Sequence, residues 1–140
     1  MEKLKALLAC LVFLVLSSCE TSLDCSFVTC LALNYEITLT DANTGENIIA
    51  TTQLSDSDIR VTNSNNEQVK AFVFQGAIVI SPRERRSNCH KLMFRNTTIE
   101  YAFDFTEGGS TCCDFGVLQN VDVRDNDFIV NGNSIEILLN

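Results

Sequence analysis

The sequence has little of what several protein classes need: no tryptophan, one histidine and one proline in 140 residues. Basic residues are also few, because ten Lys and Arg stand against eighteen Asp and Glu, for a net charge of −8. Proteins that bind nucleic acid present a basic surface to the phosphates, so this balance argues against nucleic acid as a partner. The same charge argues against holding anionic lipid head groups by electrostatics alone.

A long hydrophobic run is missing too. The apolar stretch at residues 6–16 has eleven residues, whereas a membrane-spanning helix needs about 20. Lys3 and Lys5 precede this stretch, and the small residues Ser17 and Ser18 follow it, directly before Cys19. A charged start, a short apolar run and a small-residue end are typical of an export signal that is removed from the mature protein.

Leu16-Ser17-Ser18-Cys19 resembles the lipobox of bacterial lipoproteins. The resemblance implies that residues 1–18 are a signal peptide and that Cys19 carries a covalent lipid with acyl chains such as palmitate. It implies no other cofactor, and it implies a location in the outer membrane, facing the periplasm or the cell surface. Several acyl chains hold firmly, since each buried methylene contributes about 0.8 kcal/mol. The alternative is an ordinary secretory signal with a chance cysteine at the cleavage site.

Seven cysteines in a short exported chain favour disulfides. With Cys10 in the signal and Cys19 lipidated, the disulfide candidates are Cys25, Cys30, Cys89, Cys112 and Cys113. The weakly preferred arrangement has one bridge from the Cys25/Cys30 segment and one between Cys89 and the Cys112–Cys113 pair, which leaves one thiol over. A vicinal bridge would be strained. Zinc is disfavoured because the cysteine spacings do not fit closed zinc sites, so we expect no metal.

The rest of the chain alternates apolar and polar residues in short runs bounded by turn residues. Residues 19–33 are expected to be the lipidated N-terminus with a short tether, and residues 34–140 a single domain. The expected strands are residues 35–40, 47–52, 59–62, 68–74, 77–80, 91–95, 99–106, 117–124, 128–130 and 134–139. Because hairpin signals join most of them, the sequence predicts an all-β fold, an antiparallel β-sandwich of about eight to ten short strands.

Residues 35–49, with the turn Asp41-Ala42-Asn43-Thr44-Gly45, resemble the first hairpin of transthyretin-like and carboxypeptidase-regulatory-like sandwiches. The overall layout also resembles small lipoproteins of Bacteroidota. These resemblances imply a β-sandwich in the envelope and transfer no catalytic residue. The same turn partly matches a calcium loop, but a full loop needs a glutamate at position twelve, where Thr52 stands. A solvated Asx turn is the preferred interpretation.

His90 and Cys89 are neighbours in sequence, but adjacent strand residues point to opposite faces, so we do not expect a catalytic dyad. The sequence predicts a surface histidine beside a disulfide. Aspartates at positions 56, 58, 122, 125 and 127 lie in polar turns, whereas a hydrolytic pair needs one carboxyl in an apolar pocket. The chain is therefore not expected to be an enzyme.

Arg83, Arg85 and Arg86, with Lys91 nearby, form the one basic cluster in the chain. Guanidinium groups can bind an anion or an acidic partner through bidentate contacts. The alternative is that the cluster is a solvated surface loop. The expected function is a non-catalytic binding or accessory role, with an envelope protein or a surface glycan as partner. The alternative is a structural subunit of an outer-membrane complex, held by β-strand addition at a sheet edge. A hydrolase ranks third.

Overall fold

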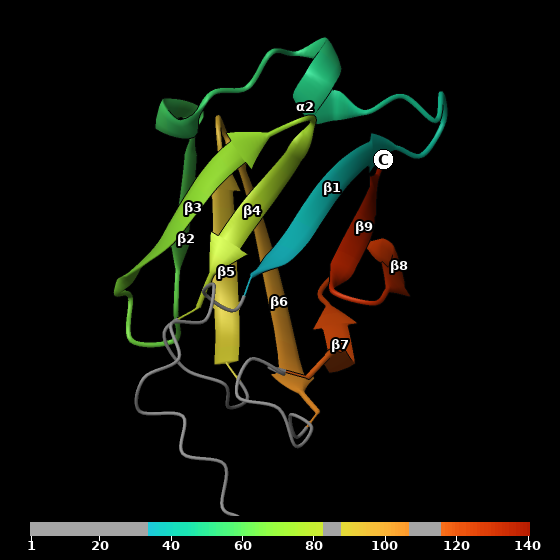
Figure 1. Cartoon of the computed structure of the whole chain (residues 1–140). Helices are drawn as coiled ribbons and strands as arrows, with labels where there is room; N and C mark the ends of the chain where they lie inside the picture. Colours follow the sequence, from blue (N-terminus) through green and yellow to red (C-terminus); the bar gives the residue numbers. More distant parts are fainter. Residues whose placement is uncertain (1–33, 83–87, 107–115) are drawn as a thin grey trace, which may run out of the picture.

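The computed structural model describes residues 34–82, 88–106 and 116–140, and Figure 1 shows the whole chain. Several predictions lie outside these ranges and stay predictions: the signal peptide, lipidation of Cys19, the tether, the cysteines 25, 30, 112 and 113, and the arginines 83, 85 and 86. Among the described residues, no helix has the length and apolar character needed to cross a membrane.

The all-β prediction is confirmed, and every strand expected from residue 59 onward is present with slightly shifted ends. The strands are β1 Tyr35–Asp41, β2 Ile59–Thr62, β3 Gln68–Phe74, β4 Ala77–Ser81, β5 Asn88–Phe94, β6 Thr97–Phe105, β7 Leu118–Val123, β8 Asp127–Asn131 and β9 Ser134–Leu139. The helical elements are α2 Ile48–Thr51 and the short 3-10 helix η1 Asp56–Asp58.

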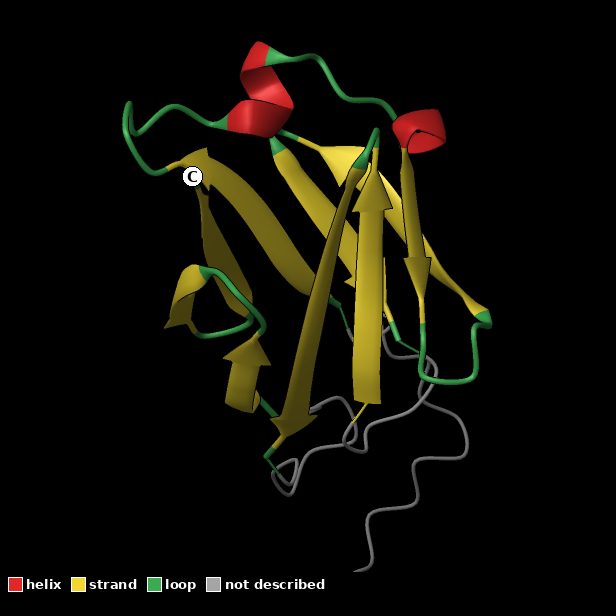
Figure 2. Cartoon of the chain, turned by 180° about the vertical axis from the view of Figure 1, so that it is seen from behind, coloured by secondary structure: helices red, strands yellow, loops and turns green. Residues whose placement is uncertain are grey.

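The nine strands form one sheet in the order β7-β6-β5-β2-β3-β4-β1-β9-β8. The sheet curls back on itself, so that β1, β3 and β4 cover β5 and β6 in Figure 1, and Figure 2 shows the reverse view. Its two edge strands, β7 and β8, come into contact. The sheet is therefore nearly closed, where the sequence predicted two packed sheets.

The expectation of a purely antiparallel fold is wrong at one pair of strands. β1 and β9 run parallel, with Glu36 beside Ser134 and Asp41 beside Leu139. All other pairs are antiparallel. Parallel neighbours need a long crossover instead of a hairpin, and here almost the whole domain supplies it. No turn motif in the sequence predicts that two strands so far apart in the chain pair in parallel.

Residues 47–52 do not form the expected strand. The side chain of Asn47 accepts a hydrogen bond from the Ala50 N–H at 2.9 Å and caps the short helix α2. Its Nδ2 donates to the Gly76 carbonyl at 2.8 Å, which ties the helix to the turn between β3 and β4. The hairpin suggested by residues 35–49 is reduced to one antiparallel bridge between Thr40 and Asn47, and β1 forms its ladders with β4 and β9.

The core fills the inside of the curled sheet. The alternation of buried and less buried residues predicted for β6 is confirmed. Every second residue is buried: Ile99, Tyr101, Phe103 and Phe105. Ile49 of α2 and Leu54 join the same core from one end of the sheet. Most strands bury alternate residues toward this core, whereas β4 buries the three consecutive residues Ile78, Val79 and Ile80.

Candidate functional site

Two of the carboxylates that the sequence placed in turns, those of Asp41 and Asp58, accept hydrogen bonds within their own turns. Oδ1 of Asp41 accepts from the N–H groups of Asn43 and Thr44, each at 2.9 Å, so the predicted Asx turn is confirmed. The hydrogen bond from Thr44 and the one from Asn43 lower the pKa of Asp41. The carboxylate is thus used within its own turn.

The two acids of η1 also accept hydrogen bonds from other groups of the domain. Asp58 accepts from the side chain of Ser55 at 2.6 Å and from its backbone N–H at 2.9 Å, and these bonds lower the pKa of Asp58. Asp56 accepts from the Val73 N–H at 2.6 Å, where β3 extends beyond its pairing with β2. The hollow beside η1 has a volume of about 180 Å³, below the roughly 300 Å³ at which ligand pockets begin.

The predicted surface position of His90 is wrong, because the side chain is buried with 2% exposure. It stacks on Tyr101 and Phe103, with ring centroids 5.6 Å and 5.2 Å away. β5 alternates, and His90 shares its inner face with Leu92 and Phe94. Cys89 lies on the outer face as an exposed free thiol, so the structure has no disulfide at Cys89.

Two buried tyrosines complete this aromatic cluster. The hydroxyl groups of Tyr35 and Tyr101 lie 2.7 Å apart and share a hydrogen bond. Burial raises the pKa of both phenols above its ordinary value. Among the described residues no buried side-chain polar atom lacks a hydrogen-bond partner, so the cluster is a satisfied part of the core.

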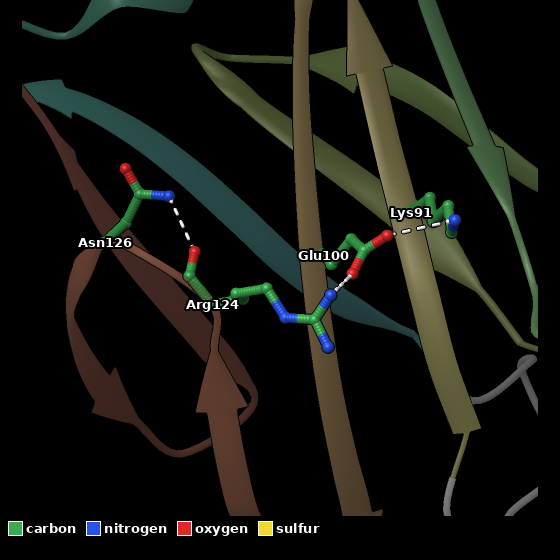
Figure 3. A network of polar contacts seen from close by, with 4 residues as sticks. All are labelled: Lys91, Glu100, Arg124 and Asn126. Carbon is green, nitrogen blue, oxygen red and sulfur yellow. Dashed lines mark hydrogen bonds and ion pairs between the residues drawn. The ribbon is translucent and has the colours of Figure 1, made fainter.

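The outer face of β5, β6 and β7 carries a charged network, drawn in Figure 3. Glu100 forms ion pairs with Lys91 at 2.9 Å and with Arg124. Asn126 donates from Nδ2 to the Arg124 carbonyl at 3.0 Å. The hydrogen bond from Lys91 and the charge of Arg124 lower the pKa of Glu100. Lys91, which the sequence grouped with the basic cluster, is therefore paired within the domain.

β8 is, with β7, one of the two edge strands of the sheet, and no other described strand covers its outer face or its second backbone edge. It pairs only with β9. Ile129 on its outer face is 55% exposed. Val130 lies opposite Ile135 and so shares its inner face, yet Val130 is 38% exposed while Ile135 is fully buried. An inner-face residue that meets solvent marks the place where the sheet stays open.

The β8–β9 register tells which backbone groups are free. Asn131 and Ser134 flank the two-residue turn Gly132-Asn133, so they exchange hydrogen bonds, and the pattern alternates from there. The N–H and C=O groups of Phe128 and Val130 therefore point away from β9. Within residues 34–82, 88–106 and 116–140, no backbone hydrogen bond to these groups is found.

The boundary between β7 and β8, here called the seam, is linked near its two ends by the contacts that the described residues make. At one end residues 124–126 connect the two strands. Toward the other end, Oδ1 of Asn133 accepts from the Leu118 N–H at 3.0 Å, and its Nδ2 donates to the Gly116 carbonyl at 3.5 Å. β7 bends at Asn120, whose φ of 50° accompanies a shift in the β6–β7 register. No backbone ladder joins β7 to β8.

The sequence predicts a strand at residues 128–130 but no role for it. A signal was present, because three consecutive apolar residues on a strand cannot all face one side. The described part of the chain has no cluster of three or more His, Cys, Asp or Glu that could hold a metal ion.

We compared the chain with known proteins. It matches no protein-family model, no curated protein and no solved structure.

Proposed function

We propose that this protein is a lipid-anchored binding module of the bacterial envelope, without catalytic activity. The observation that carries the proposal is the β8 edge, where apolar side chains and unpaired backbone groups face solvent together. Other polar groups that the sequence singled out, among them Asp41, Asp58 and Lys91, are engaged within the domain. A surface that the domain leaves unsatisfied is the natural place for a partner.

The anchor supports the same role. Lys3 and Lys5, the apolar residues 6–16 and the sequence Leu16-Ser17-Ser18-Cys19 favour a mature chain that begins at lipidated Cys19 in the outer membrane. An anchored domain meets its partner at the membrane surface. The acidic excess of the chain, with ten Lys and Arg against eighteen Asp and Glu, disfavours binding to anionic head groups, so the lipid would hold the domain at the membrane.

A structural subunit of an envelope complex is the second candidate, and the free edge of β8 favours it. Strand addition at such an edge joins subunits through main-chain hydrogen bonds. The two candidates differ in permanence: a subunit stays in a stoichiometric complex, whereas a module exchanges its partner or binds a glycan.

The anchor is tested by intact mass. We expect a chain that starts at Cys19 and carries added lipid, and we expect Cys19→Ser to release the protein from the membrane fraction. An unmodified chain with a different first residue would contradict the anchor.

The binding role is tested with the full-length protein in its own membrane. A photo-cross-linking residue replaces Ile129 on β8, and the matched control carries it at Lys70, an exposed position of β3. We expect one stoichiometric protein product from position 129 alone, or binding in a glycan screen of the detergent-solubilised protein. No product from either position and no glycan binding would contradict the proposal.

A further inference from the structure

The free edge of β8 offers two kinds of contact to one partner. Phe128 and Val130 present outward N–H and C=O groups, and Ile129 presents an exposed apolar side chain between them. A backbone edge of this kind is satisfied by another extended backbone, because a strand spaces its N–H and C=O groups at the same interval. A glycan would leave the alternating pattern largely unused.

β8 lacks several of the features by which natural edge strands prevent association, although it is short and begins with a charged residue, Asp127. Its sequence, Asp-Phe-Ile-Val-Asn, has no lysine and no proline, and its pairing with β9 has no bulge. Edges that proteins keep unpaired usually carry such features. The exposed inner-face side chain of Val130 adds a place for an apolar side chain of the incoming strand.

The charges around the edge select among possible strands. Asp122, Asp125 and Asp127 flank β8 at its beginning and on neighbouring β7, and the described part of the chain gives none of them an ion pair. Arg124, the basic residue in the same turn, forms an ion pair with Glu100. The edge is therefore acidic and favours a basic strand. A second copy of this chain, with its net charge of −8, is disfavoured for the same reason.

We propose that β8 binds an extended segment of a partner protein in which apolar residues alternate with lysine or arginine, by adding it as a strand at the free edge. The proposal rests on the proposed binding function and specifies its partner. The apolar residues of the segment pack beside Val130, and its basic residues lie near Asp125 and Asp127. Strand addition of this kind needs no change in the β8–β9 ladder.

The test uses the full-length protein in detergent micelles and blocked synthetic peptides of about seven residues, a typical strand length. One peptide alternates Lys with Val, a second replaces every Lys by Glu, and a third is the Lys peptide with N-methylated backbone amides. We expect the Lys peptide to slow hydrogen exchange at Phe128 and Val130, and to bind about tenfold more tightly than either control. Its affinity should fall as salt is raised, because the charges are exposed.

Two variants locate the site. Val130→Pro removes an outward N–H without removing a bond to β9, so we expect it to abolish binding of the Lys peptide. The matched control Val130→Thr keeps the N–H and the branched shape, and should bind normally. The pair Asp125→Asn and Asp127→Asn should weaken binding and reduce its salt dependence, whether or not the proline variant folds.

Equal binding of the Lys and Glu peptides, binding that maps away from β8, or no binding would overturn the proposal. Protection of the same amides that depends only on protein concentration would overturn it too, because the occupant would then be a second copy. If the peptides fail while cross-linking in the membrane yields a stoichiometric partner elsewhere on the domain, this inference fails and the proposed function stands.

Discussion

The β5–β6 hairpin and β8 are both strand regions at the surface, but they differ in how far the rest of the domain covers their side chains and backbone groups. The hairpin buries an aromatic cluster on its inner face and pairs Lys91 with Glu100 on its outer face. β8 buries only part of its inner face and leaves Ile129 and the outward backbone groups of Phe128 and Val130 uncovered.

The difference shows that exposure alone does not identify a binding surface. Glu100 is a prominent surface acid, yet its contacts with Lys91 and Arg124 belong to the domain itself. Ile129 looks ordinary in the sequence, but it lies beside backbone groups that nothing in the described structure satisfies. Unsatisfied groups that lie together are the stronger sign of a partner.

The largest effect should come from the core of the hairpin. Phe103→Ala empties a fully packed position and should lower the free energy of unfolding by about 3–5 kcal/mol in urea titrations. Ile129→Ala on β8 should change it by less than about 0.5 kcal/mol. Equal losses at the two positions would remove the distinction between the regions.

The buried tyrosine pair should make the domain sensitive to alkali. Tyr35 and Tyr101 are the two tyrosines of the chain, and burial raises the pKa of both. Their contribution is fully present below the ordinary tyrosine pKa near 10 and is lost as pH rises above it, at about 1.4 kcal/mol per pH unit for each. Phenolate absorbance should therefore appear only with unfolding. A normal titration near pH 10 in the folded protein would contradict the buried pair.

Loss of the two Asn133 hydrogen bonds between β8 and β7 should have an intermediate effect on the free energy of unfolding. Asn133→Ala removes the acceptor for the Leu118 N–H and the donor to the Gly116 carbonyl, so we expect a loss of about 1–2 kcal/mol in urea titrations. Asn131→Ala, at the exposed end of β8, is the matched control and should change little. If the two variants behave alike, Asn133 does not hold the seam.

The smallest effect should come from the charged network. Hydrogen bonding from Lys91 and the charge of Arg124 lower the pKa of Glu100, so the network stabilises the fold above the ordinary glutamate pKa near 4.3. This contribution is lost as pH falls through the lower folded value. Glu100→Gln should thus lower Tm slightly at pH 7 and leave it unchanged at strongly acidic pH. Glu36→Gln, an exposed acid of β1, serves as the control.

Alternation in the sequence predicts the strands well and their partners poorly. β6 follows from Ile99, Tyr101, Phe103 and Phe105, because a strand buries every second residue. The burial of His90 was predictable by the same rule, because His90, Leu92 and Phe94 are every second residue of β5 and therefore lie on the same face. Helix α2 was not predictable, because Asn47 makes its second contact with the distant Gly76.

The candidate site depends on topology that no local pattern contains. Residues 128–130 indicate a strand, but only the closing of the sheet decides that β8 is an edge. The parallel pairing of β1 with β9 places β8 there, and it joins residues about a hundred positions apart. β7, the other edge strand, forms no ladder with β8, so the edge stays uncovered by it.

The central claim is that the outward edge of β8 is free, and residue-resolved amide hydrogen exchange of the full-length protein tests it most directly. We predict alternation along the strand, with fast exchange at Phe128 and Val130 and slow exchange at Ile129, which is paired with Glu136. Uniformly slow exchange along β8 in the isolated protein would contradict the account, because the edge would already be covered.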